Sequence, residues 1–232
     1  MTRDITAARP RKTAQGAAAR APLTLYRLFW LFLIAGVLGD FIEVAFWLAT
    51  RGELTSRSSL LYGPFSIVWG MAAVLLTLVF HRMDDMSAAR IFMTGAVLGG
   101  VYEYICSLIQ EVFFGASFWD YRHLPLNLNG RINLVFCLFW GGAAVVWVRL
   151  ACPALSRFIE RIPRLRGRRI AIAAALFLTF SALLSACALG RMGQRQQGVP
   201  ASGAVARFLD ENYPDGALYS RYPNMKLCAG LD

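Results

Sequence analysis

Four acidic residues lie inside apolar stretches of this sequence, where an ionised carboxylate is costly. Asp40 and Glu43 belong to the first such stretch, and Glu103 and Glu111 belong to the third. A charge at the centre of a membrane helix costs roughly 2.5–3.5 kcal/mol even on the lenient insertion scale, so such acids usually serve a function. Two neighbouring carboxylates tend to hold a shared proton or a cation, because like charges oppose each other's ionisation. We therefore expect a site for a cation, a proton or a polar solute.

Two other roles for these acids remain open. They could act as hydrogen-bonded links between helices, accepting from hydroxyls, Trp N–H groups or Arg. Glu103 and Glu111 could also join Asp120, His123 and nearby Asn side chains, a set of mainly oxygen ligands that favours calcium or magnesium. Because the sequence has no His-x-x-x-His or paired Cys motif, we expect no metal site and no cofactor.

The connection after the third apolar stretch carries matching chemistry. Gly115 is expected to end the preceding helix, and Asn129-Gly130 is expected to form a tight turn. Arg131 stands at the start of the fourth stretch, from which it can turn toward Glu103 or Glu111. A buried Arg–carboxylate pair would offset the cost of the acid.

A second cation precedes the second apolar stretch. Arg57 is followed by Gly63-Pro64, and proline is favoured in the first turn of a helix, where free N–H groups can receive an anion. Acids and arginines together would suit a zwitterion, or an anion with a cation. The predicted binding residues are Asp40, Glu43, Arg57, Glu103, Glu111, Trp119, Asp120, Asn127, Asn129 and Arg131.

Small residues share helix faces with two of the acids. Gly39 and Glu43 are four residues apart, and so are Gly95, Gly99 and Glu103. Small residues at this spacing mark close helix–helix contact. We therefore expect the first and third spans to pack together, with Glu43 and Glu103 near each other in the outer leaflet.

The elements that must position these residues are membrane helices. Hydrophobic residues make up 57% of the 232 and charged residues 16%, against about 25% charged in a soluble domain. A helix needs about 20 apolar residues to cross a bilayer. The sequence thus predicts an all-α, polytopic membrane bundle with five spans: Leu28 to Thr50, Leu60 to Phe80, Ile91 to Phe114, Ile132 to Cys152 and Ile170 to Gly190.

The positive charges predict how these spans are oriented. Outside the carboxy-terminal tail, fifteen Lys and Arg residues fall on the side of the amino terminus and four on the other. Cytoplasmic loops retain positive charge, so we expect the amino terminus inside and the carboxy terminus outside. The net charge of +10 then reflects orientation in a bilayer, and we expect no nucleic-acid partner. The expected divisions are a disordered basic arm (1–25), a transmembrane domain (26–190) and an extracytoplasmic tail (191–232).

Several short motifs are distributed along the chain: Gly39, Glu43, Leu61-Tyr62-Gly63-Pro64-Phe65, Trp69-Gly70, Glu103-Tyr104, Glu111, Trp119-Asp120-Tyr121, Asn127-Leu128-Asn129-Gly130-Arg131-Ile132, Phe139-Trp140-Gly141 and, in the tail, Arg221 to Lys226. Together these motifs resemble the bacterial CmpB-like family of ABC-transporter type IV membrane proteins. The resemblance covers roughly residues 30 to 155. Where the family has Asn-Arg-Gly, this chain has Ser56-Arg57-Ser58, so only the Arg carries over.

The resemblance implies a transporter permease in the bacterial plasma membrane. Because the sequence lacks a Gly-x-x-x-x-Gly-Lys-Ser/Thr loop, a separate ATPase or another membrane subunit would be its partner. We expect a component that binds a small polar or charged solute in an outward-facing cavity. An enzyme at the outer leaflet, with Glu103 or Glu43 as base and Asp120 as a second acid, is one alternative. An assembly or sensor subunit that binds a partner through its tail is another.

Overall fold

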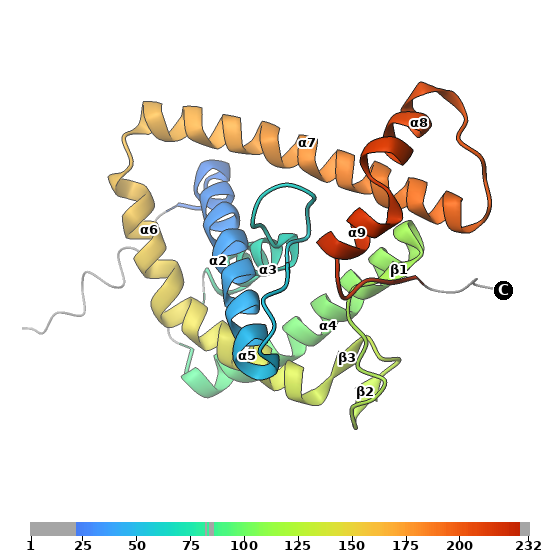
Figure 1. Ribbon diagram of the computed structural model, residues 1–232. Helices are drawn as coiled ribbons and strands as arrows, with labels where there is room; N and C mark the ends of the chain where they lie inside the picture. The colour runs from blue at the N-terminus through green and yellow to red at the C-terminus, as the bar shows by residue number, and fades with distance from the viewer. Residues whose placement is uncertain (1–21, 82, 84–85, 228–232) are drawn as a thin grey trace, which may run out of the picture.

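The computed structural model describes residues 22–81, 83 and 86–227, and its regular structure is almost entirely helical (Figure 1). The basic arm expected over residues 1–25 lies outside this part except for its last four residues. The helices are α2 (Leu25–Arg51), α3 (Ile67–Phe80), α4 (Ala88–Phe114), α5 (Leu134–Val146), the π-helical turn η1 (Trp147–Ala151), α6 (Cys152–Arg161), α7 (Arg164–Gln196), α8 (Gly203–Asn212) and α9 (Asp215–Arg221). Two short antiparallel pairs join β1 (Ala116–Ser117) to β4 (Lys226–Leu227) and β2 (Asn127–Leu128) to β3 (Ile132–Asn133).

Four helices in the described residues are long and apolar enough to cross a membrane. They are α2, α4, the continuous helix Leu134–Arg161 that comprises α5, η1 and α6, and α7. The second predicted span, Leu60 to Phe80, contains only the 14-residue helix α3, which begins at Ile67. The all-helical fold is as expected, but the span predicted here is longer than the helix that forms.

The segment before α3 stays irregular because side chains from other parts of the chain satisfy its backbone. The Ser58 hydroxyl accepts from the N–H of Phe65 at 3.1 Å, and Arg221 donates to the carbonyls of Leu60 and Gly63, both at 2.7 Å. Irregular backbone at membrane depth is tolerated where protein groups bind it in this way. The prediction that Pro64 opens a helix is therefore wrong.

The helix begins instead with a serine cap. The Ser66 hydroxyl accepts from the N–H of Trp69 at 3.4 Å, and the Ser59 hydroxyl accepts from the N–H of Ile67 at 3.0 Å. The first N–H groups of α3 are thus engaged by hydroxyls and do not form the anion site that the sequence suggested.

The helices pack as two consecutive pairs, α2 with α3 and α4 with α5. A Cβ added to Gly39 would lie 2.2 Å from the Trp69 side chain, and one added to Gly99 would lie 2.3 Å from that of Trp140. The glycines do mark close helix contacts, but each contact is with the next helix along the chain. The expectation that the first and third spans pack through these glycines is wrong.

The two pairs are an internal repeat. Both α2 and α4 carry Phe-x4-Val-Leu-Gly-x3-Glu, which starts at Phe32 and at Phe92. The segments that follow both carry Phe-x3-Trp-Gly-x-Ala-Ala-Val, with its Gly at Gly70 and at Gly141. The contacts repeat too, since a Cβ on Gly70 would collide with Phe32 and one on Gly141 with Phe92. The chain thus builds the same helix pair twice, as many membrane transporters do.

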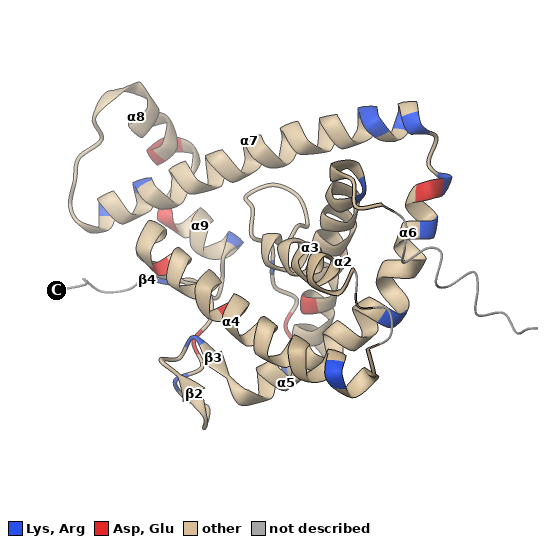
Figure 2. Cartoon of the chain, turned by 180° about the vertical axis from the view of Figure 1, so that it is seen from behind, with Lys and Arg blue, Asp and Glu red and all other residues tan. Residues whose placement is uncertain are grey.

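The carboxy-terminal elements pack against the far end of α7. Leu189 and Met192 of α7, Leu209 of α8 and Leu218 of α9 are buried in one apolar cluster that includes Ala116 of β1. Figure 1 shows α7 running from α6 to this region. Figure 2 shows the basic residues of α6 and of the start of α7 at the opposite end of the molecule from α8, α9 and the strands.

Candidate functional site

Each repeat presents one glutamate to one tryptophan. Trp69 Nε1 donates to Glu43 Oε1 at 2.5 Å, and Trp140 Nε1 donates to Glu103 Oε2 at 3.0 Å. The two indole rings contact each other, with centroids 5.5 Å apart. Glu43 and Glu103 also interact electrostatically with each other. The repeats therefore meet at equivalent residues, and two carboxylates flank that contact.

The two glutamates differ in their remaining partners. Glu43 lies 3.7 Å from the Nε of Arg57, which stacks over the Trp47 ring at 4.2 Å. Glu103 is 6% exposed and accepts a second hydrogen bond, at 2.7 Å, from the hydroxyl of Tyr121. Burial and the nearby carboxylate of Glu103 raise the pKa of Tyr121, so its hydroxyl keeps its proton. One glutamate thus faces a cation and the other a neutral donor.

Asp40 lies beside this cluster in α2. It is 4% exposed, and its Oδ1 has no hydrogen-bond partner among the described residues. Arg221 and Arg57 are the cations that act on it electrostatically. Asp40, Glu43, Arg57 and Glu103 therefore form one interior group of the predicted site residues.

A second group surrounds Arg131. Its guanidinium forms an ion pair with Glu111 and lies 5.5 Å from the centre of the Tyr104 ring. This is one of the two acids that the sequence proposed for Arg131. Asn129 donates to the Tyr104 hydroxyl at 3.0 Å, so the turn and α4 are connected.

The turn itself has the geometry that its sequence predicts. Asn129 and Gly130 both have positive φ, 54° and 70°, and Gly115 ends α4 in the left-handed conformation with φ of 58°. The Asn127 side chain accepts from the N–H of Gly130 at 3.0 Å and donates to the carbonyl of Leu124 at 2.7 Å. Asn127 therefore shapes the turn.

Asp120 is fixed at the base of this connection. Its Oδ1 accepts from both the Nε and the backbone N–H of Arg122 at 3.0 Å, and Lys226 of β4 lies 3.5 Å from its Oδ2. Hydrogen bonds from Arg122 lower the pKa of Asp120 to about 2. Asp120 is therefore ionised at neutral pH.

These side chains enclose a cavity of about 470 Å³. Charges of both signs line it, together with Ser107, which is 2% exposed. Five of the predicted site residues line the cavity: Glu111, Trp119, Asp120, Asn129 and Arg131. The other lining residues were not among the predicted site residues: Ser107, Ser117, Arg122, Gly130, Lys226 and Leu227.

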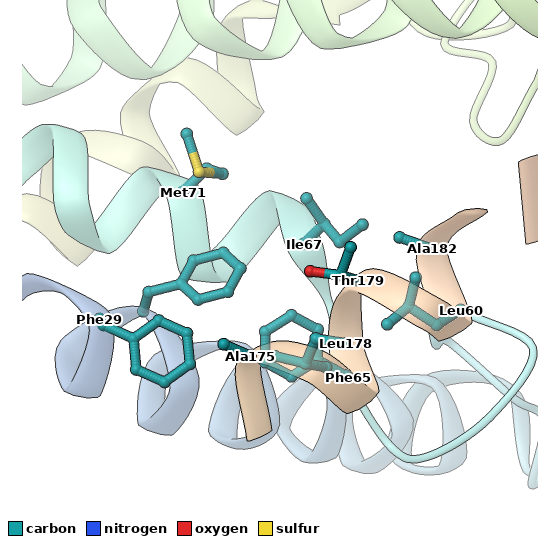
Figure 3. Close-up of a pocket in the computed structure, with 10 residues that line it drawn as sticks. Phe29, Leu60, Phe65, Ile67, Met71, Ala175, Leu178, Thr179 and Ala182 are labelled. Carbon is teal, nitrogen blue, oxygen red and sulfur yellow. The ribbon is translucent and has the colours of Figure 1, made fainter. Parts of the chain in front are cut away.

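A smaller hollow of about 220 Å³ lies between α2, α3 and α7 (Figure 3). Its lining consists of apolar side chains such as Phe29, Met71 and Leu178, with Thr179 as the single polar side chain. It has no group to pair with a charge, so the charged cavity is the candidate site for a polar solute.

Sequence reasoning missed Trp69, Trp140 and Tyr121, which hold the interior carboxylates. The internal repeat would have indicated the two tryptophans, because Trp-Gly recurs at the same place in both copies. No metal-binding group of three His, Cys, Asp or Glu residues occurs among the residues that the structure describes. His123, which the metal alternative required, is exposed.

Comparison with protein families provides a match that covers both repeats. A family model described as Putative ABC-transporter type IV (CmpB) matches residues 30–186, more than half of the chain. The chain belongs to this family. As a CmpB-type protein with four apolar helices of spanning length, it is a membrane protein and a transporter component. Comparisons with curated proteins and with solved structures gave no match.

The residues that the family model matches include most of the candidate site. The range 30–186 contains Glu43, Trp69, Glu103 and Trp140, and also the whole charged connection around Arg131. It ends within α7 and leaves out α8, α9 and β4. The CmpB-type core therefore comprises the two repeats, and the tail supplies Lys226 to the cavity from outside the match.

Proposed function

We propose that this chain is the permease-like component of a transporter and binds a small polar or charged solute in the cavity around Arg131. The observation that carries the proposal is the lining of that cavity, where three cations and two acids converge on about 470 Å³. Ligand sites typically place a few polar groups precisely in a cavity of this size. The family assignment, which is to a transporter type, supports the same reading.

The cavity has the groups that a carboxylate or a zwitterion requires. Arg131 offers a planar guanidinium, and its Nε is buried without a partner among the described residues. The Ser107 hydroxyl adds a neutral donor to the lining, while Glu111 can receive an ammonium group. An anionic group on the solute would therefore bind to Arg131 and Ser107.

The distribution of charge supports an outward-facing site in a bacterial plasma membrane. The arginine-rich α6 and the start of α7 lie at the end of the molecule away from the strands (Figure 2). Residues of β1 and β4 line the cavity. If that basic end is cytoplasmic, as positive charge favours, the cavity opens to the outside. A separate ATPase subunit would then supply the energy.

The enzymatic alternative finds less support in the same geometry. It requires Asp120 to donate a proton, yet the pKa of Asp120 is about 2 because Arg122 binds its carboxylate. A carboxyl group with so low a pKa is a poor general acid at neutral pH.

The proposal can be tested with the purified full-length chain in lipid nanodiscs. Binding of radiolabelled amino acids, dicarboxylates and inorganic phosphate is measured for the wild type, Arg131→Gln, Ser107→Ala and the surface control Glu53→Gln. We expect one solute class to bind, with affinity reduced at least about tenfold by Arg131→Gln and less by Ser107→Ala. The proposal would be contradicted if folded Arg131→Gln and Ser107→Ala proteins bound the solute as tightly as the wild type. It would also be contradicted if the wild type bound none of the three classes.

A further inference from the structure

The repeat makes Glu43 and Glu103 equivalent, yet the two copies compensate their charges differently. Both acids stand four residues after a glycine and accept from the tryptophan of a Trp-Gly pair. In the first copy Arg57 is the additional partner, and in the second it is Tyr121. We infer that Glu103 is a proton-binding site that exchanges its proton with the outer side through Tyr121.

Within the part of the chain that the structure describes, no cation forms an ion pair with Glu103. The groups that face it are Tyr121 from the connecting segment, Trp140 and Cys137 from α5, Cys106 on its own helix and, across the indole pair, Glu43. A buried carboxylate without a cation is neutralised most simply by a proton.

The hydrogen bonds at Glu103 suit either protonation state. An ionised Glu103 accepts from the Tyr121 hydroxyl at 2.7 Å and from Trp140 Nε1 at 3.0 Å. When hydronium delivers a proton, an O–H bond forms on Oε1 and water is released. The new O–H then donates to the Tyr121 oxygen, whose hydroxyl turns away, and the bond from Trp140 persists. A tyrosine hydroxyl can both donate and accept, so no side chain has to move.

A proton fits this site better than a metal ion. The indole N–H of Trp140 points at one carboxylate oxygen, and an N–H group cannot coordinate a metal. Hard cations such as Na⁺, Mg²⁺ or Ca²⁺ also need several oxygen ligands. Glu103 and Tyr121 supply only three oxygen atoms between them.

Tyr121 connects Glu103 to the segment that lines the charged cavity. Its neighbours Asp120 and Arg122 line that cavity, and its own N–H donates to the carbonyl of Gly130, another lining residue, at 2.8 Å. Its ring stacks on Phe136 of α5 at 4.6 Å, which directs the hydroxyl inward. The backbone of Tyr121 thus borders the cavity while its hydroxyl contacts Glu103, and this is the route that the inference assigns to the proton.

The longer connection of the second repeat provides this tyrosine. The glutamate and the tryptophan are 26 residues apart in the first copy and 37 in the second. The added length forms the segment that contains Tyr121 and the β2–β3 turn. Both copies thus carry the carboxylate, while the first copy pairs it with a cation and the second with the hydroxyl of a residue whose chain neighbours line the cavity.

The inference is tested with dicyclohexylcarbodiimide, which modifies protonated carboxyl groups in apolar surroundings. A carbodiimide nitrogen takes the proton of the acid while the carboxylate oxygen bonds to the central carbon, and rearrangement gives a stable acylurea. The full-length protein in nanodiscs is labelled across a pH series, and each site is quantified by peptide mass spectrometry. We expect labelling at Glu103 that falls roughly tenfold per pH unit above its midpoint, as for one titrating group.

Matched variants distinguish this site from its repeat counterpart. Glu43→Gln should leave the labelling of Glu103 in place, and Glu103→Gln should abolish it without transferring it to Glu43. Tyr121→Phe should increase labelling of Glu103 at alkaline pH, because the ionised carboxylate loses its strongest donor. Labelling of Glu43 equal to that of Glu103, or a Glu103 signal that does not change with pH, would overturn the inference. The assay contains no solute, so its outcome is independent of the proposed solute binding.

Discussion

Trp69 and Trp140 contact each other with their ring centroids 5.5 Å apart, and each donates its indole N–H to a glutamate of its own repeat. Equivalent residues of two copies touch when the axis that relates the copies passes between them. The contact therefore locates the centre of the repeat architecture. It also explains why Glu43 and Glu103 form a pair, because each copy contributes one of them.

The glycines under the two tryptophans should tolerate no side chain. A Cβ at position 99 would lie 2.3 Å from the Trp140 Cβ, so Gly99→Ala must push α4 and α5 apart. We expect a loss of about 1–3 kcal/mol, the usual cost of overpacking, measured as a lower unfolding temperature in detergent. Gly142→Ala in α5 is the matched control, since nothing lies within 4 Å of the added atom. Equal stability of the two variants would contradict this packing.

Replacing the two tryptophans should reveal the asymmetry between the repeats. Trp140→Phe removes a donor from the buried carboxylate of Glu103, whereas after Trp69→Phe the carboxylate of Glu43 still has Arg57. We expect Trp140→Phe to cost about 1–3 kcal/mol, the usual cost of an unmet buried polar group, and Trp69→Phe to cost less. The free energies of unfolding of both variants are measured by chemical denaturation. A larger loss for Trp69→Phe than for Trp140→Phe would contradict the view that Glu43 and Glu103 are compensated by different partners.

Replacing Arg57 should lower the stability of the protein, mainly because the carboxylate of Glu43 loses its cation. Arg57→Gln deprives that carboxylate of its cation, and we expect a loss of about 1–3 kcal/mol. The double variant with Glu43→Gln should recover part of this loss, because no unpaired acid remains. A double-mutant cycle on unfolding free energies measures the coupling. Strictly additive effects would show that the two side chains do not interact.

The attachment of the tail to α7 should weaken in acid. Hydrogen bonds from Arg191, and then Arg195, lower the pKa of Asp210 from 3.8 to about 2. A lowered pKa means that the stabilisation is complete above pH 3.8 and is lost as the pH falls toward about 2.

This attachment can be followed by hydrogen exchange of α8. After correction for the intrinsic pH dependence of amide exchange, we expect the protection factors of α8 to fall over that pH interval, and Asp210→Asn to lower them already at neutral pH. Glu211→Gln, on the neighbouring exposed position, should change neither result. Unchanged protection of α8 in Asp210→Asn would show that another contact holds the tail.

Local features of this chain could be read from the sequence because local chemistry decides them. Gly115 ends α4 and Asn129-Gly130 forms a turn, since both depend on left-handed backbone that few other residues adopt. The positions of the apolar helices follow from hydropathy in the same way, with one exception. Leu60 to Ser66 is apolar enough for a helix, but Ser58, Ser185 and Arg221 hold its backbone in another conformation.

The sequence by itself also determined that Glu43 and Glu103 needed partners, because a carboxylate in an apolar helix has a cost that must be met. Only the tertiary structure decided which partners these are. Arg57 is bound to Glu43 and Tyr121 to Glu103 because the connections of the two repeats differ in length and fold back differently. Hydropathy reports the free energy of transferring a segment into a membrane. Spacing reports which residues share one face of a helix. They contain no information on which segment folds over that face, so the asymmetry between two equivalent acids appears only once the chain is packed.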